Sequence, residues 1–353
     1  MMPDGNVAFL DELKEQPHVL RRVVEGYNGE LRAPLTKAAS LVKQYSSVLL
    51  VGMGSSHHAA EVLVQRLSGT YRASVWDAGE LYHYYSHLLQ DENVLCIAIS
   101  QSGESAETCA VAEILPPDAP LIAITNNEES RLALRAELVL PLLAGPEEGT
   151  SSKTFIATLV VLHLLADAVL GEELLSVETA GRLGEHMEEL IPIMTLEARQ
   201  FQERMADAHS IVLVGRGPGI ISARQGALIL QEMTRIPCSG ISGGQFRHGP
   251  LEAAGPHVAL VIFGPGGKTA ELLTRLAYDT AGFQSPTWFI TDQSVEVDED
   301  RSELFVSRLP SVAEPLSPIL SILGPELLGV ALAESKGLEP GRFTRISKVT
   351  DFE

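Results

Sequence analysis

Two stretches of the chain repeat one pattern, and this repeat restricts the possible fold more than any other feature of the sequence. They read SSVLLVGMGSSHHAAEVLVQRL at residues 46–67 and HSIVLVGRGPGIISARQGALIL at residues 209–230. Each has an apolar run, then Val-Gly-x-Gly, a turn of small residues and a helical pattern. The two copies are about one domain length apart, because 163 residues (215 minus 52) separate Gly52 from Gly215. A second pair, at residues 93–115 and 257–277, shares a strand, a glycine turn and a helix beginning at Ala-Glu. The sequence therefore predicts two similar α/β domains.

The predicted strands are continuous apolar runs, at residues 48–51, 94–99, 121–124, 211–214 and 258–263. Such runs are typical of parallel strands covered on both faces, and their alternation with helices predicts right-handed βαβ units. We therefore expect two tandem doubly wound parallel sheets of the flavodoxin-like kind, with ligands at the carboxyl ends of the strands. The predicted segments are an N-terminal helical arm (1–34), a first domain (35–190), a second domain (191–338) and a C-terminal tail (339–353).

Two helical predictions depend on local sequence. Glu15-Gln16-Pro17 in the arm predicts a helix interruption, because proline removes a backbone donor. The apolar run at residues 155–171 carries a histidine and an aspartate and is short for a membrane span, so it predicts a buried helix.

Composition excludes several classes of function. The chain has 46 acidic and 26 basic residues and a formal net charge of −20, which argues against binding to a nucleic-acid backbone. Three cysteines lie far apart, and no apolar run follows a basic amino terminus as in a signal peptide. We expect a cytoplasmic protein with no membrane partner. No Cys/His cluster has zinc spacing, so we expect no metal and no cofactor.

The segment AISQSGESAET predicts an anion site. A strand ends at Ser100, a glycine turns the chain, and a helix is expected to begin near Glu104. Ser100, Gln101, Ser102 and Ser105 then place hydroxyl and amide donors beside the backbone N–H groups of a helix N-terminus, which can bind a phosphate without a lysine. The alternative is an ordinary serine-rich helix cap, but a cap needs one such residue.

Two further turns belong with this loop. In VGMGSSHHAA, His57 stands where a dinucleotide fingerprint has its third glycine, so Ser55 and Ser56 are predicted to contact a phosphate instead. Ser151 in GTSSKTF could reach a sugar hydroxyl or belong to a helix cap. The second half reads GPGGKTAE where the first reads SQSGES, which predicts one anion site and one composite active site.

The second half and the tail contribute candidate reactive groups. Glu232 lies on a helix expected to begin near Ser222, and it is either a proton shuttle or a solvent-facing helix residue. His248, in a Gly/Ser-rich loop, is either a ring-opening group or a histidine bonded to the backbone. Lys348 is either a solvated charge or a nucleophilic amine, and a nucleophilic amine would need partial burial or a cationic neighbour.

Taken together, GMGSS, SQSGES, GTSSKTF, LQEM, GGQFRHGPLE and ISKVTDFE resemble the pair of sugar isomerase (SIS) domains of the glutamine–fructose-6-phosphate aminotransferase family. The likeness covers nearly the whole chain, in order. It implies that Ser56, Ser100, Gln101, Ser102 and Ser105 bind the sugar phosphate and that Ser151 lies near the sugar. It also implies that Glu232 moves a proton between C1 and C2, and that Lys348 forms a Schiff base. His248 would open the ring in a neighbouring subunit, which requires a homodimer.

The chain departs from that family in ways that affect the reaction. It shows no glutaminase domain, and Ile229 and Gln225 stand where the family's helix has lysine and glutamate. Gln245 and Arg247 replace Glu and Lys beside the loop histidine. We therefore expect a stand-alone aminosugar-phosphate deaminase, converting glucosamine 6-phosphate and water to fructose 6-phosphate and ammonia or the reverse. A fructosamine 6-phosphate deglycase and a non-catalytic sugar-phosphate sensor are the alternatives.

Overall fold

The computed structural model describes residues 8–296 and 302–350, which divide into two compact units. The first unit consists of Glu15–Gly184 together with the tail from Thr344, and the second consists of Glu185–Phe343 together with the chain up to Lys14. Helices α1 (Ala8–Asn28) and α8 (Val177–Arg204) contribute residues to both units. The predicted segment boundaries at residues 34, 190 and 338 remain a proposal.

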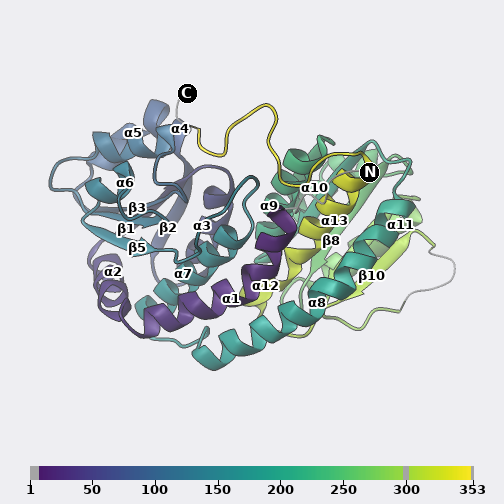
Figure 1. The fold of residues 1–353 in the computed structure, drawn as a ribbon, viewed down its shortest axis with the longest axis horizontal. Helices are drawn as coiled ribbons and strands as arrows, with labels where there is room; N and C mark the ends of the chain where they lie inside the picture. The colour runs from purple at the N-terminus through teal and green to yellow at the C-terminus, as the bar shows by residue number, and fades with distance from the viewer. Residues whose placement is uncertain (1–7, 297–301, 351–353) are drawn as a thin grey trace. The chain divides into compact units, whose positions relative to one another are not determined.

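The first unit is built on one parallel sheet (Figure 1). Its strands are β1 Ser47–Gly52, β2 Arg72–Asp77, β3 Val94–Ile99, β4 Leu121–Thr125 and β5 Leu138–Pro141. Its helices are α2 Arg32–Gln44, α3 Gly54–Leu67, α4 Ala78–Tyr84, α5 Ala106–Ile114, α6 Arg131–Arg135 and α7 Lys153–Leu170, with a 3-10 helix at Ser86–Gln90. The strand order is β2-β1-β3-β4-β5, and each neighbouring pair is parallel.

Apolar side chains cover both faces of this sheet, as the continuous apolar runs predict. Alternate residues of β1, β3 and β4 join α4 and α5 in one buried cluster, which includes Val51, Cys96, Leu81 and Val111. Helix α3 packs on β1 and β2 and also contacts α7. Helix α7 in turn contacts α2. The first sheet is therefore the middle layer of an α/β/α sandwich.

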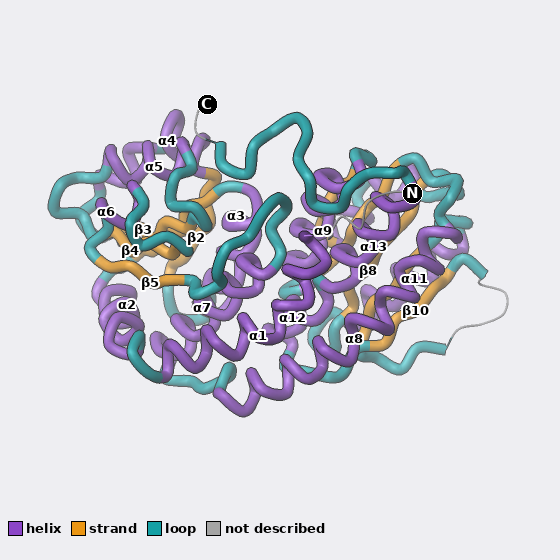
Figure 2. Tube along the Cα trace, viewed as in Figure 1, coloured by secondary structure: helices purple, strands orange, loops and turns teal. Residues whose placement is uncertain are grey.

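The second unit repeats the same topology. Figure 2 draws its helices in purple and its strands in orange. Its strands are β6 Ser210–Gly215, β7 Cys238–Ser242, β8 Val258–Gly264, β9 Thr287–Thr291 and β10 Leu304–Arg308. Its helices are α9 Gly219–Thr234, α10 Gly243–Arg247, α11 Ala270–Gly282, α12 Ser317–Ser321 and α13 Leu323–Ser335, with 3-10 helices at Pro250–Ala253 and Glu314–Leu316. The order β10-β9-β8-β6-β7 reproduces that of the first sheet, with all pairs parallel. The prediction of two similar doubly wound sheets is confirmed.

The predicted interruption of the arm at Pro17 is wrong, because α1 continues through it for 21 residues. Phe9, Leu13, Leu20 and Val24 recur at helical spacing and are buried, with exposed fractions of 1% or less. Burial of this apolar stripe outweighs the one backbone hydrogen bond that a proline removes.

Three helices begin near their predicted positions, with shifts of two or three residues at most. The expected helix near Glu104 begins at Ala106, and the one expected near Ser222 begins at Gly219. The two Ala-Glu pairs open α5 and α11, as the repeat predicts.

Two stretches are long and apolar enough to cross a membrane by composition alone. They are α7 and the stretch Glu314–Ser335, and they are 89% and 100% buried inside the described part of the chain. The prediction that residues 155–171 form a buried helix is therefore confirmed by α7.

Candidate functional site

Two predicted loops begin at neighbouring strand ends of the first sheet. In the order β2-β1-β3-β4-β5 the strand order reverses between β1 and β3, because β2 is added on one side of β1 and the later strands on the other. The last residues of β1 and β3, Gly52 and Ile99, are paired. Ligands of doubly wound sheets bind at this switch point, outside the carboxyl ends of the strands. Ser55 and Ser56 lie in the first turn of α3 after β1, and Ser100 directly follows β3. The topology thus brings the two predicted phosphate-contacting turns to one edge of the sheet.

The loop between β3 and α5 is held by its own serines. Ser100 is buried, and its Oγ accepts a hydrogen bond from Gly103 N at 3.1 Å. The Oγ of Ser102 accepts one from Glu104 N at 3.1 Å. Gly103 has a φ of +68°, a conformation that glycine adopts without strain. A hydroxyl that accepts such a bond keeps its own proton for a further acceptor, such as a phosphate oxygen.

The remaining loop residues are fixed from the side. The carbonyl of Gln101 accepts from Asn126 N at 3.0 Å, and the carbonyl of Gly103 accepts from Leu132 N at 3.1 Å. Ser105 Oγ donates to Glu107 Oε2 at 3.2 Å. The loop is therefore tied to the ends of β4 and α6 as well as to its own helix.

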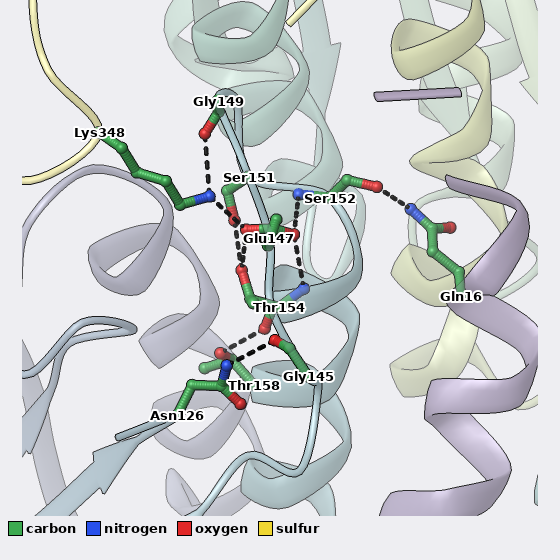
Figure 3. Close-up of polar contacts among 10 residues, drawn as sticks. All are labelled: Gln16, Asn126, Gly145, Glu147, Gly149, Ser151, Ser152, Thr154, Thr158 and Lys348. Carbon is green, nitrogen blue, oxygen red and sulfur yellow. Dashed lines mark hydrogen bonds and ion pairs between the residues drawn. The ribbon is translucent and has the colours of Figure 1, made fainter. Parts of the chain in front are cut away.

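The tail lies against this edge of the sheet. The carbonyl of Thr350 accepts a hydrogen bond of 3.0 Å from the N–H of Ala106, the first residue of α5. Lys348 Nζ donates to Glu147 Oε2 at 2.8 Å and to the Gly149 carbonyl at 2.9 Å (Figure 3). The tail therefore contacts both the predicted phosphate loop and the loop that carries Ser151.

The surroundings of Lys348 meet one of the two alternative requirements for a nucleophilic amine. Its side chain is 22% exposed, so partial burial is present, and the charged group beside it is the fully buried carboxylate of Glu147 rather than a cation. Arg342, which precedes Lys348 in the tail sequence, is paired with Glu339 at 2.8 Å. The Lys348 amine is thus held in place by a carboxylate and a backbone carbonyl of one loop.

Glu147 is a site residue that the sequence analysis did not identify. Its Oε1 accepts from the N–H groups of Ser152 and Thr154 at 2.9 and 3.0 Å, at the beginning of α7. Its Oε2 accepts from Thr154 Oγ1 at 2.6 Å. Ser151 Oγ lies 3.0 Å from the same Thr154 Oγ1, so Lys348, Glu147 and Ser151 belong to one hydrogen-bonded network (Figure 3). The signal available in the sequence was an acidic pair directly before a Ser/Thr-rich helix start.

Glu232 and His248 belong to the second unit. Glu232 is half-buried near the end of α9, so its burial does not decide between a proton shuttle and a solvent-facing helix residue. His248 is exposed directly after α10, and its backbone N–H donates to the Gln245 carbonyl at 3.1 Å. Their proposed catalytic roles remain predictions.

Carboxylates occupy the equivalent loop of the second unit. After β8, Gly266 N donates to Asp292 Oδ1 at 2.6 Å. At Gly267 an added Cβ would lie 2.2 Å from Glu314 Oε2. Negative charges fixed before α11 disfavour a bound anion in this loop, and the loss of the anion site in this half stays a prediction.

The described residues offer neither a metal cluster nor a reactive thiol at this edge. No group of three or more His, Cys, Asp or Glu side chains is placed to hold a metal in residues 8–296 and 302–350. Cys109 Sγ lies 3.4 Å from the Gly103 carbonyl, and burial raises the pKa of this thiol. Such a thiol stays protonated and is a poor nucleophile.

A chain with two such sheets is a doubly wound α/β protein, and its serine-rich loops lie where such folds bind ligands. The family described as "SIS domain" matches residues 40–168 and 204–298, more than half of the chain. The chain belongs to the SIS domain family, and its two units are tandem SIS domains.

Relatives and solved structures share this architecture. The chain is 32% identical to glutamine–fructose-6-phosphate aminotransferase of Pyrococcus horikoshii and 29% identical to that of Thermococcus kodakarensis, over 98% of its length in both. It spans 58% of the length of each of these relatives. The C-terminal domain of glucosamine-fructose-6-phosphate aminotransferase from Francisella tularensis superposes with a TM-score of 0.80, at 20% identity, covering 97% of this chain and 100% of that chain. Glucosamine-6-phosphate deaminase from Thermotoga maritima gives 0.74 at 22% identity, covering 97% and 99%. At these identities the two structures bear on the fold alone.

Proposed function

We propose that this protein is an aminosugar-phosphate deaminase, which converts glucosamine 6-phosphate and water to fructose 6-phosphate and ammonia, or catalyses the reverse. The observation that carries the proposal is the docked tail. A lysine amine is held at the loop of Ser151, while the tail carbonyl of Thr350 bonds to the residue that follows the predicted phosphate loop. A sugar phosphate bound at that loop would present its reacting carbons at a distance from its phosphate, where an amine is needed.

The proposed steps assign one role to each predicted site residue. Ser55, Ser56, Ser100, Gln101, Ser102 and Ser105 bind the phosphate, and Ser151 contacts the sugar. Phosphate binding far from C1 and C2 supplies orientation to the reacting carbons. Glu232 transfers the proton between C1 and C2, and Lys348 forms the Schiff base with the open-chain ketose.

His248 is proposed to open the sugar ring in a neighbouring subunit, so the active form is proposed to be a homodimer. Its imidazole is exposed on the single chain, which leaves it accessible to a second copy. Sedimentation at micromolar concentration measures this directly. A monomer with full activity would contradict the role of His248 in a partner.

The reaction is tested by a coupled assay for ammonia over a panel of aminosugar phosphates and fructosamine 6-phosphates. We expect ammonia from glucosamine 6-phosphate and its loss in Glu232→Gln. Release of an amino acid from fructosamine 6-phosphates alone would support a deglycase instead. Binding of hexose phosphate with no turnover of any panel member would support a sensor and refute both enzymes.

A further inference from the structure

The loop between β5 and α7 forms a rigid acceptor for the tail lysine. Leu143, Gly145 and Gly149 all have positive φ angles, of 53°, 75° and 71°. Asn126, at the end of β4, donates through Nδ2 to the Gly145 carbonyl at 2.7 Å and accepts from Ala144 N at 3.0 Å (Figure 3). The backbone that presents Glu147 is therefore fixed by a side chain of the sheet.

The carboxylate of Glu147 is also fixed independently of the lysine. Three of its four hydrogen bonds come from Ser152 and Thr154, at the N-terminus of an 18-residue helix where negative charge is favoured. The fourth donor is Lys348 Nζ. The side chain of Glu147 is 0% exposed, so the ion pair is shielded from water on its acidic side and is screened little by salt.

We propose that Glu147 is the positioning residue of the tail: it anchors the Lys348 amine beside Ser151 and thereby docks residues 344–350 over the phosphate loop. The docking does not depend on the identity of the substrate. Its contribution to turnover rests on the proposed function. Two acceptors from one loop, Glu147 Oε2 and the Gly149 carbonyl, fix the place of Nζ to within hydrogen-bond geometry.

Glu147→Gln separates the anchor from the helix cap. The amide oxygen of glutamine can still accept from the N–H groups of Ser152 and Thr154, while its amide nitrogen then faces Lys348 and cannot accept from an ammonium. Glu148→Gln removes the same charge from the adjacent, exposed position and is the matched control. Lys348→Met removes the ion pair from the tail side without changing the loop.

The first test measures docking without any substrate, by the rate at which an amine-acetylating reagent modifies each lysine. In the unmodified protein we expect Lys348 to react at least about tenfold more slowly than the exposed Lys336, because its amine is bonded to two acceptors. In Glu147→Gln, Lys348 should approach the rate of Lys336. Lys153, which is 3% exposed and paired with Glu15, should stay protected in every variant and thus report that the unit is folded. Equal protection of Lys348 in Glu147→Gln and the unmodified protein would overturn the proposal.

The second test measures turnover of the substrate found in the ammonia assay. We expect Glu147→Gln to lower kcat at least about tenfold, equivalent to about 1.4 kcal/mol, with KM changed less than threefold, since the phosphate loop keeps its contacts. Lys348→Met should abolish turnover, because it removes the amine that forms the Schiff base, and the control Glu148→Gln should leave kcat unchanged. Unchanged kcat in Glu147→Gln, or an equal loss of kcat in Glu148→Gln, would overturn the role in turnover. A protein with no turnover at all would refute the proposed function, while the acetylation rates would still decide whether Glu147 docks the tail.

Discussion

Gly103 is the residue on which the shape of the predicted phosphate loop most depends, and Gly103→Ala tests that shape. An alanine Cβ at this position would lie 1.9 Å from Ser130 Oγ and 2.4 Å from Ser130 Cβ. Ser130 cannot move away easily, since its Oγ donates to the Asn127 carbonyl at 2.7 Å and accepts from Ala133 N as the cap of α6.

The expected cost has two parts. The φ of +68° costs an L-residue about 1–2 kcal/mol, and overpacking of a filled site costs about 1–3 kcal/mol. We therefore expect Gly103→Ala to lower the free energy of unfolding of the first unit by about 2–5 kcal/mol. Gly69→Ala is the control, because no atom lies within 4 Å of its added Cβ, and it should change stability by less than about 0.5 kcal/mol.

Urea unfolding followed by tryptophan fluorescence measures this change in the relevant unit. The chain has two tryptophans, so a Trp288→Phe background leaves Trp76 of β2 as the reporter. Ser130→Gly removes both contacted atoms, and we expect the Gly103→Ala/Ser130→Gly pair to be less destabilised than the sum of its parts by about 1–3 kcal/mol. Equal stability of Gly103→Ala and Gly69→Ala, or strict additivity with Ser130→Gly, would refute the reasoning.

Two other features of the structure give measurable expectations. Arg66 and Asp167 are each 8% exposed and form an ion pair of 2.7 Å. Arg66→Met removes the cation from the buried Asp167 carboxylate, so it should lower the free energy of unfolding by about 3–5 kcal/mol. The exposed pair Arg131–Glu113 is the control, and Arg131→Met should change the stability far less than Arg66→Met in the same urea titration. Burial raises the pKa of the Cys96 thiol to about 12, so a disulfide reagent at pH 8 should modify Cys96 only after urea is added. Because the folded pKa is raised from 9.0, this thiol's contribution to stability is full below pH 9 and is lost as the pH rises toward 12; rapid modification of the native protein would contradict the buried position.

The sequence predicted the sheets because their strands are buried on both faces. A run such as Val94–Ile99 is continuous and apolar only where helices cover both sides of the sheet, so its position as a buried strand could be predicted from the sequence. The first residues of helices were harder to predict, because the residue at which α5 begins depends on the preceding loop rather than on an apolar stripe. The continuation of α1 through Pro17 could not be predicted from the local sequence, because it depends on burial of Phe9, Leu13 and Leu20.

The candidate site shows the same limit. The serine loops follow predicted strands, and a parallel sheet has the carboxyl ends of all its strands at one edge, so the placement of both loops at that edge was predictable. The role of Glu147 could not be predicted, because GPEEGTSS has two adjacent glutamates and only the fold decides which side chain is buried. The anionic neighbour of Lys348 lies 201 residues away in sequence, and no local pattern could identify it.

Chemical trapping of a sugar phosphate on Lys348 tests the central claim most directly. The protein is incubated with fructose 6-phosphate and borohydride, which reduces a Schiff base to a stable amine, and the adduct is located by peptide mass spectrometry. The account predicts one adduct, on Lys348, that is absent in Lys348→Met and absent when fructose replaces fructose 6-phosphate. No adduct, or adducts spread equally over exposed lysines such as Lys336 with either sugar, would contradict it.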